Sequence, residues 1–465
     1  MQTKLFKTSV TLIALALAQQ AAATGYHFGT QSVSSQSTAN SSSAEASDAS
    51  TIFYNPAGLT HLENSQVTGV VDFVFPYIHY RDADANHRSP TGGIGPKVQG
   101  VTSGKITDTV TVAPHLYGAY KLNDKVTLGL GVYVPFGSET EYQRDSVMRY
   151  NINRLGLTTI AVEPVVSFKA NDKHSFGVGL VAQYSEAKLR KYADIGASRR
   201  LPGMADAYGE VEGNDWGYGY QLAWMYDVND RFRLGVNYRS KVNHDLRGSA
   251  EWKPSDAQAE ALQKMALGAG GIPSVGYKEK EGAHVKLVTP ESLSVHGMYR
   301  ANDKLNLFGD VTWTRHSRFD TADLVFENKK MVSAKNVSDT TRILPGWRNT
   351  YKIAVGGSYQ INEPWQLRAG FAFDKSPIRN AETRLNTLPD GNRMWFSVGA
   401  RYTPNKKHTF DVAVSHIHIN DTTVNSPAAV QDANGQLTSV DSKGRNSAKF
   451  RNHANILGVQ YTYKF

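Results

Sequence analysis

Two histidines near the end of the chain have a spacing that could bind a metal ion. His416 and His418 are separated by one residue, which places both imidazoles on the same face of a β-strand. The pair nevertheless continues an alternation of apolar residues, and this register predicts that both imidazoles face outward with them. The apolar residues of that alternation are Phe410, Val412 and Val414. We therefore expect no metal site here.

A second candidate for metal binding lies in a polar stretch of the first hundred residues. Asp82, Asp84 and Asn86 have the alternating oxygen ligands with which a calcium loop begins. His87 stands where such a loop needs glycine, and Gly93 stands where it needs a bidentate glutamate. The sequence also lacks the Gly-x-Ser-x-Gly turn that presents a nucleophilic serine. These patterns predict a protein that is not an enzyme and uses neither a metal nor another cofactor.

The composition limits the fold to a few classes. The 465 residues include no cysteine, 40 glycines without a fixed period, 18 Phe, 23 Tyr and 7 Trp, which excludes disulfide-stapled, collagen-like and disordered chains. Mean hydropathy is −0.42, and the sustained apolar run at 9–18 is too short to cross a bilayer as a helix. A bundle of membrane helices is therefore excluded.

The first residues have the order of a secretory signal peptide. Lys4 and Lys7 precede the apolar run, and the alanines at 21–23 follow it. We expect residues 1–23 to be removed, which takes away both lysines and lowers the net charge from +9 to +7. This charge suits an anionic surface such as lipopolysaccharide, whereas secretion disfavours nucleic acid as a partner. An exported chain without disulfides must close its own backbone hydrogen bonds or bury a large core.

A short turn pattern recurs through the rest of the chain. In each copy an aromatic residue is followed three positions later by asparagine, and a polar or charged residue comes next. Alternation of apolar and polar residues flanks every copy, which predicts β-hairpins. The asparagines of the six copies are Asn123, Asn171, Asn229, Asn302, Asn362 and Asn405.

The hairpins predict a closed barrel rather than a soluble β-sandwich. The aromatic residues gather at strand ends beside the turns, as in the interfacial girdles of outer-membrane barrels, and glycine gathers on the polar face, as when the wall packs against an internal plug. Six turns join twelve strands, and end strands at about 67–80 and 449–465 make fourteen antiparallel strands with both termini on the periplasmic side. The long connections would be extracellular, and one holds a predicted helix after Pro254. Those connections lie at about 81–105, 138–156, 191–213, 246–281, 320–345, 377–391 and 421–447.

The two ends of the mature chain carry further signals. The last strand alternates and ends in Phe465, which resembles the signal read by the outer-membrane barrel assembly machinery. Residues 24–62 are rich in serine and alanine at first, and the later stretch 48–59 is apolar and rich in turn residues. Because such a stretch must pack on something, we expect residues 24–62 to plug the lumen of a barrel formed by residues 63–465.

These motifs together resemble the FadL-type family of long-chain fatty-acid transporters. Asn55-Pro56-Ala57 resembles the signature of the family's plug, or hatch, and the stretch 25–28, with Tyr26 and Phe28, resembles its N-terminus. The resemblance spans the mature chain and is nearest to the neisserial branch. Further matching segments lie at 134–137, 234–240, 289–292, 347–351, 373–377 and 388–393.

The resemblance implies a function and a set of site residues. It implies a monomer in the outer membrane of a Gram-negative bacterium that takes up long-chain fatty acids or similar hydrophobic molecules passively. Ligand would pass from an extracellular groove to an internal pocket and leave sideways through the barrel wall. Matching flanks place Lys191, or Arg190 beside it, and Arg342 at the family's carboxylate-binding positions. The hatch residues Tyr26, Phe28, Asn55, Pro56 and Ala57 would control passage.

Three alternatives remain open from the sequence. The same fold could take up aromatic or aliphatic hydrocarbons, which need no carboxylate-binding residue. A general porin would need an open lumen and no hatch. An adhesive or receptor role of the loops is compatible with transport.

Overall fold

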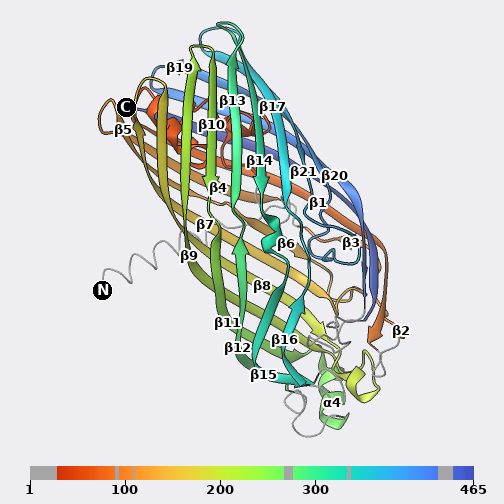
Figure 1. The fold of residues 1–465 in the computed structure, drawn as a ribbon. Coiled ribbons are helices and arrows are strands. Elements are labelled where there is room, and N and C mark those ends of the chain that lie inside the picture. The colour runs from red at the N-terminus through yellow and green to blue at the C-terminus, as the bar shows by residue number, and fades with distance from the viewer. Residues whose placement is uncertain (1–28, 89–93, 108–109, 267–275, 332–336, 428–443) are drawn as a thin grey trace.

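The protein forms a closed antiparallel β-barrel (Figure 1). The computed structural model describes residues 29–88, 94–107, 110–266, 276–331, 337–427 and 444–465. Fourteen strands make the wall, and several consist of two segments in line. Their bounds are β1 (Gln66–Arg88), β4 (Thr111–Lys121), β5 (Val126–Tyr133) with β6 (Gly137–Glu141), β7 (Ile152–Lys169), β8 (His174–Ala193), β9 (Ala207–Asn229), β10 (Phe232–Arg239) with β11 (Val242–Pro254), β12 (Lys280–Thr289) with β13 (Ser292–Arg300), β14 (Leu305–Thr314) with β15 (Ala322–Met331), β16 (Val337–Ile343) with β17 (Thr350–Gln360), β18 (Trp365–Asp374), β19 (Arg393–Asn405), β20 (His408–Ser426) and β21 (Asn446–Lys464).

Shorter elements complete the described fold. Two short strands pair with β1 near its far end, and the helices lie in the N-terminal segment and in the loops. None of the helices among the described residues has the length and hydropathy needed to cross a bilayer. The elements are β2 (Ile94–Lys97), β3 (Gly104–Lys105), α2 (Val33–Gln36), α3 (Thr51–Tyr54), α4 (Ala257–Ala266), and the 3-10 turns η1 (Pro56–His61), η2 (Gly196–Arg199) and η4 (His316–Arg318).

The barrel closes between its first and last strands. β1 pairs antiparallel with β21 from Gln66, opposite Lys464, to Ala85, opposite Asn446. On its other side β1 pairs with β4. Closure gives both strands a partner on each side. It removes the unpaired sheet edge, whose backbone groups would be costly in hydrocarbon and could pair with another chain. The prediction of a fourteen-stranded antiparallel barrel is confirmed.

The predicted alternation fixes which residues face outward. On β20, Phe410, Val412 and Val414 are exposed, whereas Asp411 between them and Ser415 after them are buried. His416 and His418 continue the exposed series, as the register predicts. An exposed apolar face with a polar interior is the pattern of strands that lie in lipid.

The asparagine turns form as predicted, by one repeated hydrogen-bond pattern. In five turns the asparagine Oδ1 accepts from the backbone N–H groups two and three residues later, which replaces a missing ladder bond with a local one. In the turn at Asn362, Oδ1 accepts from the N–H of Trp365. The five are Asn123, Asn171, Asn229, Asn302 and Asn405.

Most connections at the opposite end are shorter than predicted, because the strands extend beyond the apolar band; the connection between β18 and β19, at 375–392, is slightly longer than predicted. β1 continues to Arg88, β8 to Ala193 and β15 to Met331. These outer portions carry polar residues on both faces. The alternation of apolar and polar residues that predicts a strand therefore ends there, although the hydrogen-bonded ladder continues. The predicted loop helix is present as α4, and it is capped by Asp256, whose Oδ1 accepts from the N–H of Ala259 at 2.7 Å, rather than by Pro254 and Ser255.

Residues 29–62, which we call the N-terminal segment, lie inside the barrel near the short turns (Figure 1). Its many small polar residues are buried because inward-facing side chains of the wall supply their hydrogen-bond partners. The N–H of Val33 donates to Gln460 Oε1 at 2.9 Å, and Gln36 Nε2 donates to Ser415 Oγ at 3.2 Å. The exact limits of the signal peptide and hatch stay predictions.

Glycines of the wall let the N-terminal segment approach closely. A Cβ atom on Gly370 would lie 2.1 Å from the backbone carbonyl of Thr38, and one on Gly177 would lie 2.5 Å from the backbone nitrogen of Ala57. Neither backbone could yield to such a contact without moving the segment. The glycines on the polar face of the strands therefore make room for the packed interior, as their position in the sequence suggests.

Two ion pairs hold the segment to the wall. Arg368 Nη2 lies 2.5 Å from Glu45 Oε2, and Arg401 Nη2 lies 3.3 Å from Asp48 Oδ2. Arg401 also pairs with Asp411 at 2.7 Å. Removing one member of a buried pair leaves the other charge uncompensated, at a cost of about 3–5 kcal/mol.

We predict that Glu45→Gln loosens the N-terminal segment without preventing barrel assembly. Burial raises the pKa of Glu45, but Arg368 outweighs burial and leaves that pKa below its ordinary value of 4.5. Because this pKa is lower in the folded than in the unfolded protein, the ion pair stabilises the fold fully when the pH is above the unfolded-state pKa. The stabilisation is lost only as the pH falls through the folded-state pKa. Single-channel recordings should show more frequent openings in the variant at neutral pH, and in the wild type only when the pH has fallen below the ordinary glutamate value of 4.5.

The exposed neighbour Glu63 supplies a matched control for this test, since Glu63→Gln removes the same charge outside the ion pairs. If Glu45→Gln channels stayed closed and had the same conductance as Glu63→Gln channels, the role of Glu45 in anchoring the N-terminal segment would be contradicted.

Candidate functional site

The barrel wall is interrupted between β5 and β6. β5 ends at Tyr133 and β6 begins at Gly137, and Pro135 between them has no N–H to give to a ladder. The flanking amides turn to side chains instead: Val134 N donates to His115 Nδ1 at 3.2 Å, and Phe136 N donates to Thr159 Oγ1 at 2.9 Å. The chain therefore leaves the regular path of the third barrel strand at this point.

Beyond the interruption, β4 and β6 part. β4 pairs with β5 only from Leu116 onward, and its earlier residues pair with β1 alone. β6 pairs with β7, and among the described residues no ladder joins it to β4. On that side a single backbone bond, from Glu141 N to Ile106 O at 2.8 Å, ties the end of β6 to the segment before β4. β6 is also held by contacts across the lumen, where Thr140 Oγ1 donates to Thr387 O at 2.8 Å. The wall thus has a discontinuity between two neighbouring strands.

An apolar cluster lies inside the wall at this level. Its side chains come from the interruption, from β7, β11 and β12, and from two segments that enter the lumen between strands. An apolar interior at this place differs from the water-filled lumen of a porin. The fully packed members are Phe136, Leu157, Leu246, Leu287, Trp347, Ile378 and Leu388.

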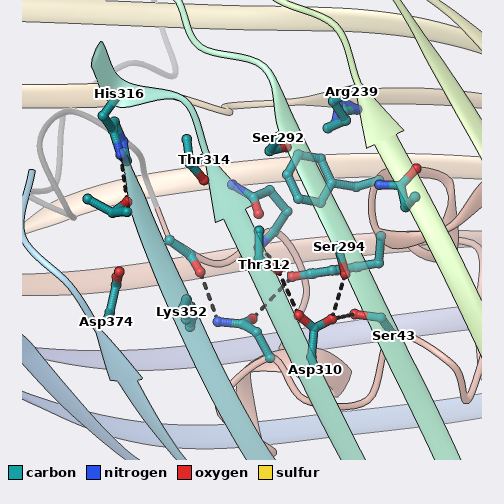
Figure 2. A pocket seen from close by; sticks show the side chains of 17 residues that line it. Ser43, Arg239, Ser292, Ser294, Asp310, Thr312, Thr314, His316, Lys352 and Asp374 are labelled. Carbon is teal, nitrogen blue, oxygen red and sulfur yellow. Dashed lines mark hydrogen bonds between the residues drawn. The ribbon is translucent and has the colours of Figure 1, made fainter. Parts of the chain in front are cut away.

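Two adjoining cavities lie between the interruption and the N-terminal segment. The larger cavity, of about 120 Å³, runs along β13, β14 and β17, and Figure 2 shows Ser294, Thr312 and Lys352 among its lining side chains. The smaller cavity, of about 40 Å³, reaches the interruption, and its lining includes Tyr133, Pro135 and Phe136. The two cavities share the lining residues Phe53, Arg239, Ser292 and Thr314.

Arg239 connects the N-terminal segment to the interruption. Its Nη2 lies 2.5 Å from Glu163 Oε2, and its Nη1 donates to the hydroxyl of Tyr133, the last residue of β5, at 2.9 Å. The guanidinium also lies 4.4 Å from the centre of the Phe53 ring, a cation–π contact. The side chain of Arg239, at the end of β10, therefore contacts both the N-terminal segment and the interruption of the wall.

Asn55 holds the sharp turn predicted for the Asn-Pro-Ala motif. Its Oδ1 accepts from the N–H of Ala57 at 3.1 Å, so its Nδ2 is the donor to Trp224 O and to His296 Nε2, at 3.1 and 2.8 Å. His296 must then carry its proton on Nδ1, where it lies 2.8 Å from Ser294 Oγ. Ser294 in turn donates to Asp310, which faces the larger cavity.

The other hatch residues predicted from the sequence are placed in part. Pro56 and Ala57 are buried in η1, and the carbonyl of Pro56 accepts from Ser167 Oγ at 2.5 Å. Tyr26 and Phe28 lie outside the described residues. Their gating role and that of Asn55 stay predictions.

The predicted carboxylate-binding residues do not line the cavities described above. Arg190 is buried and donates to Glu141 Oε1 at 2.7 Å, and Lys191 beside it is partly buried on β8. Arg342 lies on β16 and binds Asp323 through two nitrogens, at 2.7 and 2.6 Å, about a third exposed. Their role in binding a ligand stays a prediction.

Phe465 follows β21 and is 58% exposed, with its N–H donating to Ser65 O at 2.9 Å. Its role as an assembly signal is likewise a prediction.

Sequence reasoning missed Arg239, Glu163, His296 and Lys352. Each sits on the polar face of an alternating strand, where a charged residue facing the lumen looks the same as one facing solvent. For Arg239 the available signal was its place at the end of a strand, just before Ser240-Lys241, in a segment that resembles the family's. For Lys352 it was the apolar neighbour on either side, which turns the lysine inward.

Comparison with known proteins identifies the family. The model of the family described as "Outer membrane protein transport protein (OMPP1/FadL/TodX)" matches residues 14–465. A protein of Neisseria meningitidis serogroup B, provisionally named as an outer membrane protein, is 57% identical over 99% of this chain and 98% of its own. The long-chain fatty acid transport protein of Escherichia coli K12 is 26% identical over 90% of this chain and 93% of its own.

A solved structure gives the same fold. The FadL homologue of Pseudomonas aeruginosa superposes with a TM-score of 0.80, covering 95% of this chain and all of its own, at 23% identity. The match of the family model to almost the whole chain and the neisserial relative agree with the closed barrel and its lipid-facing strands. The chain therefore belongs to the OMPP1/FadL/TodX family of outer membrane transport proteins and resides in the outer membrane of a Gram-negative bacterium.

Proposed function

We propose that the protein takes up long-chain fatty acids, or hydrophobic molecules like them, passively across the outer membrane. The observation that carries this proposal is the discontinuity between β4 and β6, which adjoins an apolar cluster and cavity inside the barrel. A molecule bound there has a path into the membrane that does not pass through the aqueous periplasm.

The physical chemistry of a long alkyl chain favours such a path. Each buried CH₂ group contributes about 0.8 kcal/mol, so an apolar interior retains an alkyl chain that a water-filled pore would exclude. The ligand would enter among the extracellular loops, occupy an internal pocket and leave sideways between β4 and β6. The N-terminal segment, which fills the lumen near the short turns, opposes passage straight through the barrel and disfavours a general porin.

The carboxylate separates fatty acids from neutral hydrocarbons. Basic residues are present in the outer half at Lys191, Arg190 and Arg342, and the relative in Escherichia coli is named for fatty-acid transport. An uncharged hydrocarbon would use the same apolar path without them. Fatty acids are the substrate class that we propose, and hydrocarbon uptake is the alternative.

A charge at the interruption should block lateral exit. Phe136→Asp places a carboxylate in an apolar cluster, where it repels the headgroup and disfavours the tail, so oleate uptake at equal surface levels should fall at least about tenfold. Phe136→Leu keeps the site apolar and should retain uptake. Heat-modifiable mobility on gels checks that both barrels are folded. Equal uptake by the two variants would exclude this exit.

The turn at Asn55 should matter for uptake and not for assembly. Asn55→Ala leaves Ala57 N and the buried His296 ring without their partner, at about 1–3 kcal/mol for each unpaired group, while the strands and Phe465 are untouched. We expect normal amounts of folded barrel and reduced oleate uptake. Unaltered uptake at equal surface levels would favour a purely structural turn.

Charge at Lys191 and Arg342 should select acids over esters. Loss of a charge-assisted bond of about 1.5–3 kcal/mol lowers affinity roughly ten- to hundredfold. We expect Lys191→Ala and Arg342→Ala to weaken binding of a long-chain fatty acid and to leave its methyl ester unchanged. Wild-type protein that binds acid and ester equally would refute carboxylate recognition and favour hydrocarbon uptake.

A further inference from the structure

Lys352 faces the larger cavity without a direct ionic partner (Figure 2). Its Nζ lies 4.4 Å from the centre of the Trp395 ring, and among the described residues no hydrogen bond or ion pair reaches it. A ring face compensates an ammonium group only in part, at about 0.5–2 kcal/mol. An anion that entered the cavity would find a cation whose strongest interactions are still unused.

The carboxylates of this cavity leave that cation available. Asp310 accepts from Ser43, Ser294 and Thr312 at 2.7, 3.0 and 2.7 Å, so hydroxyl groups already satisfy it. Asp374 lines the same cavity and attracts Lys352 through space, but no direct pair forms between them. Arg239, at the other end, is neutralised by Glu163. Lys352 is thus the cation of the cavity lining that lacks a direct anionic partner among the described residues.

The two adjoining cavities together offer a cation and an apolar lining. The larger cavity contributes Lys352 and the hydroxyls of Thr312, Thr314 and Thr350. Beyond the shared residues Phe53 and Arg239, the smaller cavity leads to the interruption of the wall at Phe136. Their volumes, about 120 and 40 Å³, hold a headgroup and its first methylenes rather than a whole long chain. The rest of an alkyl chain would have to extend through the discontinuity toward the membrane.

From this arrangement we infer that Lys352 forms an inner binding site for the carboxylate of a long-chain acid, with the alkyl chain directed toward the gap between β4 and β6. The inference rests on the proposed function and adds a second site, distinct from the outer one predicted at Lys191 and Arg342. It also sets the direction of departure. The tail enters the membrane first, and the carboxylate, held at Lys352, leaves last.

The test compares the binding of a fatty acid and of its methyl ester in variants of Lys352. Purified full-length barrel is titrated with oleate and with methyl oleate in the wild type, Lys352→Met and Lys352→Arg. Lys352→Met keeps the length of the side chain and removes its charge, so oleate affinity should fall about tenfold while methyl oleate affinity stays the same. Lys352→Arg should restore selectivity for the acid. Lys304→Met removes an equally charged but exposed lysine and should change nothing.

Trp395 supplies a readout that does not need a lysine variant to fold. Oleate should draw the ammonium away from the ring and change the tryptophan emission of the wild type more than methyl oleate does. That difference should disappear in Trp395→Phe. Equal emission changes with acid and ester, or an unchanged preference for oleate in Lys352→Met, would overturn the inner site.

Failure of this proposal can be told from failure of the proposed function. If cells take up oleate through the wild-type barrel but Lys352→Met keeps its acid preference, fatty-acid transport stands and the inner site is wrong. If the wild type takes up no oleate at all, the proposed function itself fails.

Discussion

In hydrocarbon every backbone N–H and C=O group must have a partner inside the protein, and the architecture described above depends on this constraint. It accounts for the closure of β1 on β21 and for strands whose ladders continue past the apolar band. It also gives meaning to the place where the neighbouring strands β4 and β6 part. Between β4 and β6 the constraint is met by other means, such as the bonds from Val134 to His115 and from Phe136 to Thr159. These two amides therefore need no ladder partner where the third barrel strand is interrupted.

The interior satisfies a second constraint, because a barrel of this size has a lumen that polar side chains alone would leave wet. The N-terminal segment fills part of it with small residues, and wall glycines such as Gly370 and Gly177 let its backbone come within contact distance. Salt bridges from Arg368 and Arg401 then fix its position. Above the segment the interior is apolar, and Arg239 stands where these two regions meet.

The sequence predicted the parts of the fold that depend on local chemistry. Period-2 alternation and the asparagine turns give the strand number, the closure and the outward face of His416, since both act over a few residues. The outer strand ends were predicted too short because residues there, as at the end of β15, are polar on both faces. The Asn-Pro-Ala turn also follows from local rules, since Asn55 bonds the backbone two residues on.

The contacts of the site could not be read in the same way. The neighbourhood of Arg239 and Phe53, or of Lys352 and Trp395, exists only after the barrel curves round and brings distant strands together. Pro135 did mark an irregular strand, but the parting of β4 from β6 depends on how far each ladder continues. Lys191, Arg190 and Arg342 were placed by resemblance, and their positions in the wall add neither support nor contradiction for a ligand.

The anchoring of the N-terminal segment has a consequence for the order of folding. Helix α2 packs against β19, β20 and β21, and the bond from Val33 to Gln460 joins positions 427 residues apart. Contacts of such long range form late, because the entropy of closing a large loop must be overcome first. The residues synthesised first thus acquire their native environment only when the last strands arrive. Sealing of β1 against β21 and enclosure of the segment are then a single late event, in which the lumen is filled as the cylinder shuts.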